Sequence, residues 1–318
     1  MPRSSTGQSS TRPDAVADAV GQQTRCGYAA LIGAPNSGKS TLLNRLVGHK
    51  LAIVTPKAQT TRTRLLGIAI EGSTQVIYAD TPGIFAPRRR LDRAMVAAAW
   101  SGAEDADETL LLVDAARGID EHIGRILKCL TERGRRSMLA LNKIDRVRRD
   151  NLLRLAEKLS DLGRFDPVFM ISALTGEGVE DVKRHLAASL PPGPWLYPED
   201  QLSDAPERLI AAEVTREQVF LQLRDELPYA SAVETEKWED RPDGSVRIEQ
   251  VIYVQRPGQR AIVLGEGGQR IKAIGARARA ELERILERRV HLFLFVKVRK
   301  RWDEDREHFA TLGLDYEA

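Results

Sequence analysis

A glycine-rich stretch near the start of the chain has the residue types needed to hold phosphate groups. It reads Gly-Ala-Pro-Asn-Ser-Gly-Lys-Ser-Thr over residues 33–41, after an apolar run and at the start of an amphipathic one. Glycines let backbone N–H groups curl around phosphate oxygens, and a helix N-terminus adds positive potential. The lysine of such a loop reaches the β- and γ-phosphates, and the next hydroxyl binds Mg²⁺. The alternative is a structural glycine turn. The predicted nucleotide contacts in this loop are Gly33, Asn36, Ser37, Gly38, Lys39, Ser40 and Thr41.

A carboxylate motif follows at the end of a later apolar run. It reads Asp-Thr-Pro-Gly over residues 80–83. Asp80 in this position can hold Mg²⁺, usually through water, and the N–H of Gly83 can meet the γ-phosphate. The order along the chain is the one that a nucleotide-hydrolysing site requires.

Two further motifs predict which base is bound. Asn-Lys-Ile-Asp ends an apolar run at residues 142–145, and Ser-Ala-Leu follows another at 172–174. The Asp145 carboxylate can accept hydrogen bonds from N1–H and the exocyclic amine of guanine, whereas adenine would leave this charge unpaired. The second motif can turn backbone N–H groups toward guanine O6. Each motif alone could be ordinary loop chemistry, but the four together predict a GTP or GDP site. The added contacts are Asn142, Lys143, Asp145, Ser172, Ala173 and Leu174.

A polar segment at residues 55–64 is the predicted switch loop, which orders around Mg²⁺ and the γ-phosphate. Thr61 is the preferred metal ligand and Thr60 the alternative. Arg62 and Arg64 could supply charge to the transition state, but a charged surface or an RNA contact is the favoured interpretation. The predicted Mg²⁺ ligands are Ser40, Thr61 and Asp80, and the predicted catalytic residues are Lys39, Thr61 and Gly83.

Two positions bear on the rate of hydrolysis. In Ras-like GTPases a Gln just after the carboxylate motif orients the attacking water, whereas Ile84 here can neither accept nor donate a proton. We therefore expect slow intrinsic turnover, suited to a molecular timer. Asn36 has two open interpretations: it helps to bind K⁺ beside the phosphates, or it only shapes the loop.

The motifs fall at the ends of predicted strands in an α/β domain. Short apolar runs alternate with amphipathic ones between about residues 27 and 190, which is typical of a parallel sheet with crossover helices. Two strand-like runs between 64 and 79 flank Glu71-Gly72-Ser73 and predict a hairpin with one antiparallel edge strand. The predicted strands are 28–32, 109–114, 138–141 and 168–171, and the predicted helices are 39–47, 91–106, 119–133, 150–162 and 179–190. The fold class is a P-loop GTPase domain.

A second domain is predicted after the proline-rich connector at 191–198. Its predicted elements are a helix at 206–226, strands at 231–238 and 245–255, a short helix, a glycine turn at 265–268, a helix at 269–288 and a strand at 290–298. The predicted division of the chain is a flexible tail at 1–25, the GTPase domain at 26–192, a linker at 193–205, an RNA-binding domain at 206–302 and a C-terminal tail at 303–318.

The glycine turn and local charge of this domain point to RNA. A Gly-x-x-Gly turn between two helices lets a nucleic-acid backbone approach closely, as in KH domains. Residues 256–301 carry 13 basic and 4 acidic side chains, a local excess of nine positive charges in a chain of net charge +3. We therefore predict an α+β type II KH domain, with a purely structural helix-turn-helix as the alternative. The predicted RNA contacts are Gly265, Glu266, Gly267, Gly268, Arg270 and Lys272.

Composition favours a soluble cytoplasmic protein. Cys26 and Cys129 lack the spacing of a zinc site or a disulfide framework, and no apolar run has the length of a signal peptide or a membrane span.

The motifs together resemble the Era family of bacterial ribosome-assembly GTPases, from about Tyr28 to Trp302. The resemblance rests on the four nucleotide motifs, Lys-Ala-Gln-Thr-Thr-Arg at 57–62, Glu-Leu-Pro-Tyr at 226–229 and the KH segment through Val290-His291-Leu292. It implies a Mg²⁺-dependent GTPase that binds 16S ribosomal RNA near its 3′ end and assists maturation of the 30S subunit. GTP would favour the RNA-binding form, and hydrolysis would favour release. It further implies a cytoplasmic monomer, with peripheral association with the inner membrane left open.

One departure from the family concerns the glycine turn. The family often carries a Lys between the glycines, whereas this chain has Glu266-Gly267, so Arg270 and Lys272 are expected to carry more of the RNA contact. Two other functions remain as alternatives: an RNA-binding adaptor whose nucleotide only stabilises the fold, and a GTPase of tRNA modification or membrane trafficking.

Overall fold

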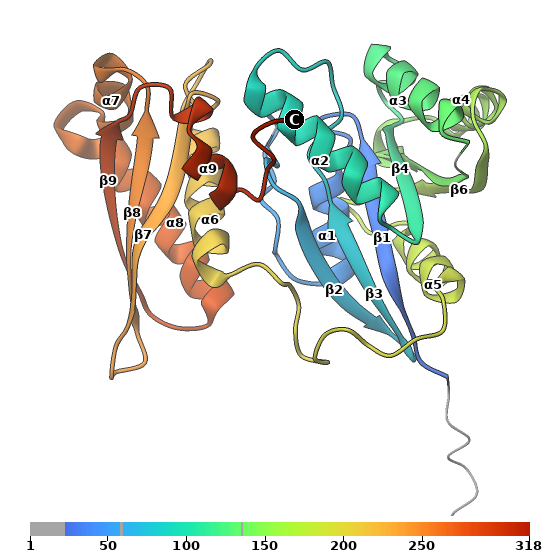
Figure 1. The fold of residues 1–318 in the computed structure, drawn as a ribbon, viewed down its shortest axis with the longest axis horizontal. Helices are drawn as coiled ribbons and strands as arrows, with labels where there is room; N and C mark the ends of the chain where they lie inside the picture. Colours follow the sequence, from blue (N-terminus) through green and yellow to red (C-terminus); the bar gives the residue numbers. More distant parts are fainter. Residues whose placement is uncertain (1–22, 58–59, 135) are drawn as a thin grey trace, which may run out of the picture.

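The first domain is a six-stranded sheet with the strand order β2-β3-β1-β4-β5-β6 (Figure 1). The computed structural model describes residues 23–57, 60–134 and 136–318, so most of the predicted N-terminal tail, and Ala58 and Gln59 of the switch loop, lie outside the described residues. The strands are β1 (Arg25–Gly33), β2 (Leu65–Glu71), β3 (Thr74–Asp80), β4 (Glu108–Asp114), β5 (Ser137–Asn142) and β6 (Phe165–Ile171). All pairs are parallel except β2 with β3, which confirms the predicted antiparallel edge.

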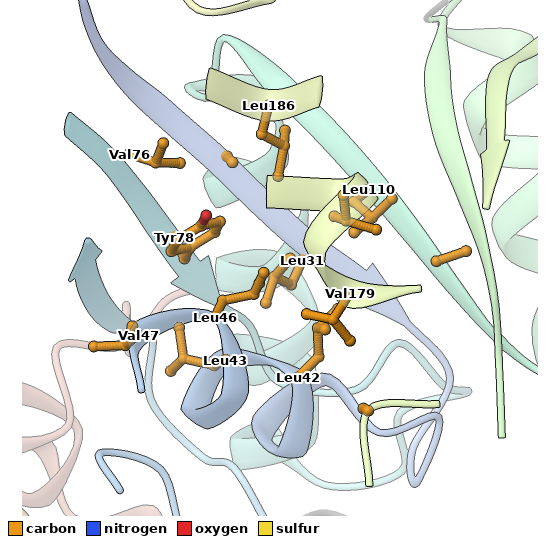
Figure 2. Packing of buried hydrophobic residues seen from close by; sticks show 14 of the residues in the cluster. Leu31, Leu42, Leu43, Leu46, Val47, Val76, Tyr78, Leu110, Val179 and Leu186 are labelled. Carbon is orange, nitrogen blue, oxygen red and sulfur yellow. The ribbon is translucent and has the colours of Figure 1, made fainter. Parts of the chain in front are cut away.

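Helices cover both faces of this sheet. On one face, Leu42, Leu43 and Leu46 of α1 pack with Leu31 of β1 and Val179 of α5, as Figure 2 shows. Apolar residues spaced three and four apart place these side chains on one side of the helix. The bounds on this face are α1 (Lys39–Val47) and α5 (Val179–Ser189), and on the other α2 (Arg90–Glu104), α3 (Glu121–Glu132) and α4 (Arg149–Leu162).

The strand register brings the predicted motifs to one edge of the sheet. Leu31 pairs with Asp80, Asp114 with Asn142, and Asn142 with Ile171. Because parallel strands end at the same edge, the loops that follow them meet there.

The second domain is a three-stranded sheet of order β7-β8-β9 with helices packed on one face (Figure 1). Its elements are α6 (Glu207–Gln222), β7 (Ser231–Asp240), β8 (Val246–Val254), α7 (Pro257–Leu264), η2 (Glu266–Gly268), α8 (Gln269–Leu286) and β9 (Val290–Val298). Helix α6 ends four residues before the predicted position, since the backbone of Leu223 is already extended. The order of elements is otherwise the predicted one.

The C-terminal residues pack against both domains rather than forming a free tail. They include η3 (Trp302–Glu304) and α9 (Arg306–Thr311), and the chain ends beside α2 (Figure 1). Phe309 and Leu314 are buried with Met95 of α2 and Ala232 of β7. Helix α9 is not predicted from the sequence, because a helix of six residues has too few apolar positions for a helical periodicity to be recognised. Throughout the described ranges, no helix combines the length and apolar character needed to span a membrane.

Candidate nucleotide site and RNA-binding surface

The phosphate loop curls around the side chain of Lys39 at the start of α1. Its Nζ is buried and donates to the carbonyl oxygens of Gly33 and Ala34, both at 3.2 Å. Burial lowers the pKa of Lys39 to about 8, and the nearby Asp80 charge opposes this shift. Gly38 has a φ of 103°, and a Cβ there would lie 2.2 Å from Nδ2 of Asn142, so only glycine fits.

Three oxygen ligands predicted for Mg²⁺ converge beside this loop. The Ser40 hydroxyl donates to Asp80 Oδ2 at 2.7 Å and lies 2.9 Å from the Thr61 hydroxyl. Thr60, the alternative ligand, is directed elsewhere, to the Thr55 hydroxyl and the Lys57 carbonyl. The structure therefore brings Thr61, not Thr60, to the carboxylate.

The other carboxylate oxygen indicates that a cation fits here. Asp80 is fully buried, and its Oδ1 has no hydrogen-bond partner among the described residues. Burial raises the pKa of Asp80 to about 6, while the Lys39 charge lowers it. An unpaired buried carboxylate oxygen is costly, and hydroxyl and carboxylate oxygens are hard ligands that suit Mg²⁺.

A cleft of about 540 Å³ opens above the phosphate loop, a volume that suits a nucleotide. The predicted residues that line it are Asn36, Gly38, Lys39, Ser40, Thr41, Thr61, Gly83, Asn142, Lys143, Asp145, Ala173 and Leu174. Gly33, Ser37, Asp80 and Ser172 are buried beside it. All predicted nucleotide residues therefore meet in one region.

Asn142 ties the phosphate loop to the two base-recognition loops. Its amide donates to the Ser37 carbonyl at 2.8 Å and accepts from the backbone N–H of Lys143 and Ala173 at 2.8 and 2.9 Å. The Ser172 hydroxyl donates to Asp145 Oδ1 at 2.7 Å, which orients the carboxylate in the cleft.

Asp114 is a site residue that sequence reasoning missed. Its carboxylate lies 2.7 Å from Lys143 Nζ, which also donates to the Asn36 carbonyl. The available signal was its position as the last residue of β4, level with Asn142. Asn36 itself adopts a φ of 64°, which Asn tolerates, and its side chain donates to the Pro56 carbonyl at 3.1 Å.

Arg62 of the switch loop is neither solvated nor aimed at the phosphates. It is 5% exposed and donates to the carbonyl oxygens of Tyr229 and Ser231 in the second domain. The favoured interpretation, a charged surface or an RNA contact, is therefore wrong for Arg62. Arg64 is half-buried, with its guanidinium 5.9 Å from the Tyr28 ring.

The predicted RNA surface is built on an open glycine turn. Gly265, Gly267 and Gly268 all have positive φ, and, apart from the adjacent residues in the chain, no described residue has an atom within 4 Å of a Cβ built at Gly267 or Gly268. The side chains of Glu266 and Lys272 are exposed. Arg270 is exposed and donates to the Ile262 carbonyl at 3.0 Å. The turn thus leaves its backbone accessible, as an approaching RNA backbone requires.

Comparisons with known proteins agree with both domains. A family model described as "50S ribosome-binding GTPase" matches residues 28–143, and one described as "KH domain" matches residues 226–303. GTPase Era of Rhizobium meliloti (strain 1021) is 60% identical over 306 residues, which is 96% of this chain and 97% of that protein. The chain belongs to the Era family of GTPases. This membership confirms the recognised family, the GTPase activity and the predicted pair of domains.

Two solved Era structures resemble most of the chain. One is Era in complex with MgGDPNP and nucleotides 1506–1542 of 16S ribosomal RNA, and the other is a variant of Aquifex aeolicus Era bound to GDP·AlF4⁻. Each has a TM-score of 0.86 and 37% identity, and each comparison covers 91% of this chain and 99% of the other. Era from Brucella suis biovar 1 (strain 1330) is 58% identical over 92% of this chain and 94% of its own length.

Proposed function

We propose that this Era-family GTPase is a molecular switch that binds 16S ribosomal RNA near its 3′ end and assists maturation of the 30S subunit. The observation that carries the proposal is the physical link between two sites in one chain. A guanine-nucleotide cleft in the first domain is joined, through the switch loop, to the domain that carries the open glycine turn. The Era structure with a GTP analogue and an RNA segment supports the same pairing.

The chain's own residues lead us to expect slow hydrolysis. Bound Mg²⁺, held by Ser40, Thr61 and Asp80, would neutralise charge on the β- and γ-phosphates. Lys39 would exchange its carbonyl partners for phosphate oxygens. Ile84 has an aliphatic side chain, which is buried among apolar residues, and it has no group that could hydrogen-bond the attacking water or take its proton. We extend the proposal to a cytoplasmic monomer, with peripheral contact to the inner membrane as an open alternative.

Single-turnover hydrolysis separates this switch from an RNA-binding adaptor. We expect GTP bound to the full chain with Mg²⁺ to be hydrolysed clearly faster than free GTP, at a rate on the order of 10⁻³ per second or slower, since the site lacks the water-orienting Gln. A rate equal to the no-enzyme background would contradict the switch and support the adaptor.

The same assay tests the proposed role of Asn36 in binding K⁺. If a monovalent cation supplies charge beside the phosphates, hydrolysis should be at least about 5-fold faster in KCl than in NaCl of equal ionic strength. Equal rates in KCl and NaCl would contradict the K⁺ role. Asn36 would then only shape the loop, through its conformation and its contact with the Pro56 carbonyl.

A further inference from the structure

Described residues in the switch loop and just before it contact α6 of the RNA-binding domain. Immediately before the loop, the Val54 N–H donates to Glu217 at 2.9 Å. Further along, the Lys57 ammonium donates to the carbonyl oxygens of Phe220 and Leu223 at the C-terminal end of α6, where unpaired carbonyls favour a cation. The loop that carries Thr61 is therefore anchored to the other domain.

Arg216 of α6 contacts the residue that precedes the predicted metal ligand Thr61. It is 2% exposed, its Nε lies 2.7 Å from Glu213 Oε1, and its guanidinium carbon lies 5.3 Å from the Phe220 ring centroid. Its NH2 group donates to the backbone carbonyl of Thr60. The NH1 group is buried without a hydrogen-bond partner among the described residues, so the polar contacts of this guanidinium with Glu213 and Thr60 are made by Nε and NH2.

The Thr60 carbonyl belongs to the peptide group that joins Thr60 to Thr61. Because a peptide unit is planar, fixing that oxygen also fixes the N–H and the Cα position of Thr61, so that on this side only rotation about the N–Cα bond is left to change where its side chain starts. On the far side of Thr61, Arg62 is held by the same domain, with its guanidinium carbon 5.3 Å from the Trp302 ring centroid. The predicted metal ligand thus lies between two residues that the RNA-binding domain holds.

We propose that Arg216 is a positioning residue for GTP hydrolysis. By binding the Thr60 carbonyl it keeps the Thr61 hydroxyl 2.9 Å from Ser40, so α6 of the RNA-binding domain completes the Mg²⁺ site of the GTPase domain. This inference rests on the proposed role of Thr61 as a metal ligand. It also gives a route by which a shift of α6 changes hydrolysis without touching the nucleotide.

The test compares Arg216→Met with Lys50→Met. The first substitution removes the donors to Thr60 but keeps a side chain along Phe220. The second removes a different contact between the domains, the ion pair of Lys50 with Glu217 and Glu281 at 2.7 and 3.0 Å. We expect Arg216→Met to slow single-turnover hydrolysis about 10-fold, because small displacements of positioned groups cost this much or more. Hydrolysis by Lys50→Met should stay within about 2-fold of the unmodified chain, because the partners of Lys50 are Glu217 and Glu281 and not the Thr60 carbonyl.

A second readout does not depend on activity. Mg²⁺ slows the release of a bound fluorescent GTP analogue, and the Mg²⁺ concentration that gives half of this effect should be about 5-fold higher for Arg216→Met. The reason is that the metal would have lost a positioned ligand. The affinity for GDP should stay unchanged. Thermal melting checks that each variant folds. If Arg216→Met does not fold, Arg216→Lys keeps the charge beside Glu213 with fewer donors and should slow hydrolysis about 3-fold.

A double-mutant cycle with Thr61→Ala decides the outcome. If Arg216 acts through Thr61, Arg216→Met should change the rate by less than about 2-fold in the Thr61→Ala chain. Two results would overturn this inference without affecting the proposed role of Thr61. One is an equal loss of hydrolysis rate from Arg216→Met in the unmodified and the Thr61→Ala chains. The other is a folded Arg216→Met chain with unmodified hydrolysis and Mg²⁺ dependence. Unmodified hydrolysis in Thr61→Ala would instead refute the proposed metal ligand, and the inference with it.

Discussion

Asp145→Asn is expected to weaken GTP binding about 100-fold and to admit xanthine nucleotides, because the buried hydrogen bonds lost to guanine are worth about 1–3 kcal/mol each. The amide offers a donor where the carboxylate accepted from the guanine amine, and xanthine carries a carbonyl oxygen at that position. Asparagine retains the oxygen that accepts from Ser172, so the loop should keep its shape. Competition between GTP and XTP for the purified chain measures the change.

The neighbouring Arg146 provides the control for this substitution. Its Nε lies 3.7 Å from Asp145 and its side chain is largely exposed, so Arg146→Gln should leave the nucleotide preference within about 2-fold. Unchanged GTP selectivity in Asp145→Asn would refute the role of this carboxylate in recognising guanine.

Gly268→Asp is expected to weaken RNA binding at least about 10-fold, because a carboxylate would then face the phosphate backbone. The φ of 76° at Gly268 is one that Asp tolerates, and the space around a Cβ is open, so the fold should persist. Hydrolysis of GTP should not change, since the turn lies outside the nucleotide cleft. RNA affinity is measured with a labelled fragment from the 3′ end of 16S ribosomal RNA.

Gly244→Asp is a matched control for strain and charge. Gly244 has a φ of 78° with no described atom within 4 Å of a built Cβ, but it lies in the turn between β7 and β8. We expect it to bind RNA within about 2-fold of the unmodified chain. A loss of both RNA binding and hydrolysis in Gly268→Asp would indicate misfolding, and unchanged RNA affinity would refute the contact.

The elements of the nucleotide site could be predicted because each motif is local in sequence and follows a strand. Gly38 has a positive φ, which favours glycine, and Asp80 and Asn142 are the last residues of strands β3 and β5. These positions can be recognised from the order of residues along the chain. The parallel topology then brings the loops together without further information. The helical face of α8 was predictable for the same reason, since Ile274, Ala278 and Leu282 recur at helical spacing and are fully buried.

Contacts between the domains could not be predicted from the same signals. Arg62 is read as a solvated charge because its partners are carbonyl oxygens more than 160 residues away, and no side-chain type marks them. Arg216 lies on α6, whose other face packs the core, and its contact with Thr60 depends on how the domains dock. The packing of α9 against α2 depends on the same docking. The way in which the two domains pack together cannot be predicted from hydrophobic periodicity or motif spacing, because these are local features of the sequence.

Crosslinking of the full chain to RNA in cells, followed by sequencing of the bound RNA, tests the central claim most directly. The account predicts enrichment of the 3′ end of 16S ribosomal RNA, and loss of that enrichment in Gly268→Asp but not in Gly244→Asp. Bound RNA that contains no small-subunit ribosomal RNA would contradict the account.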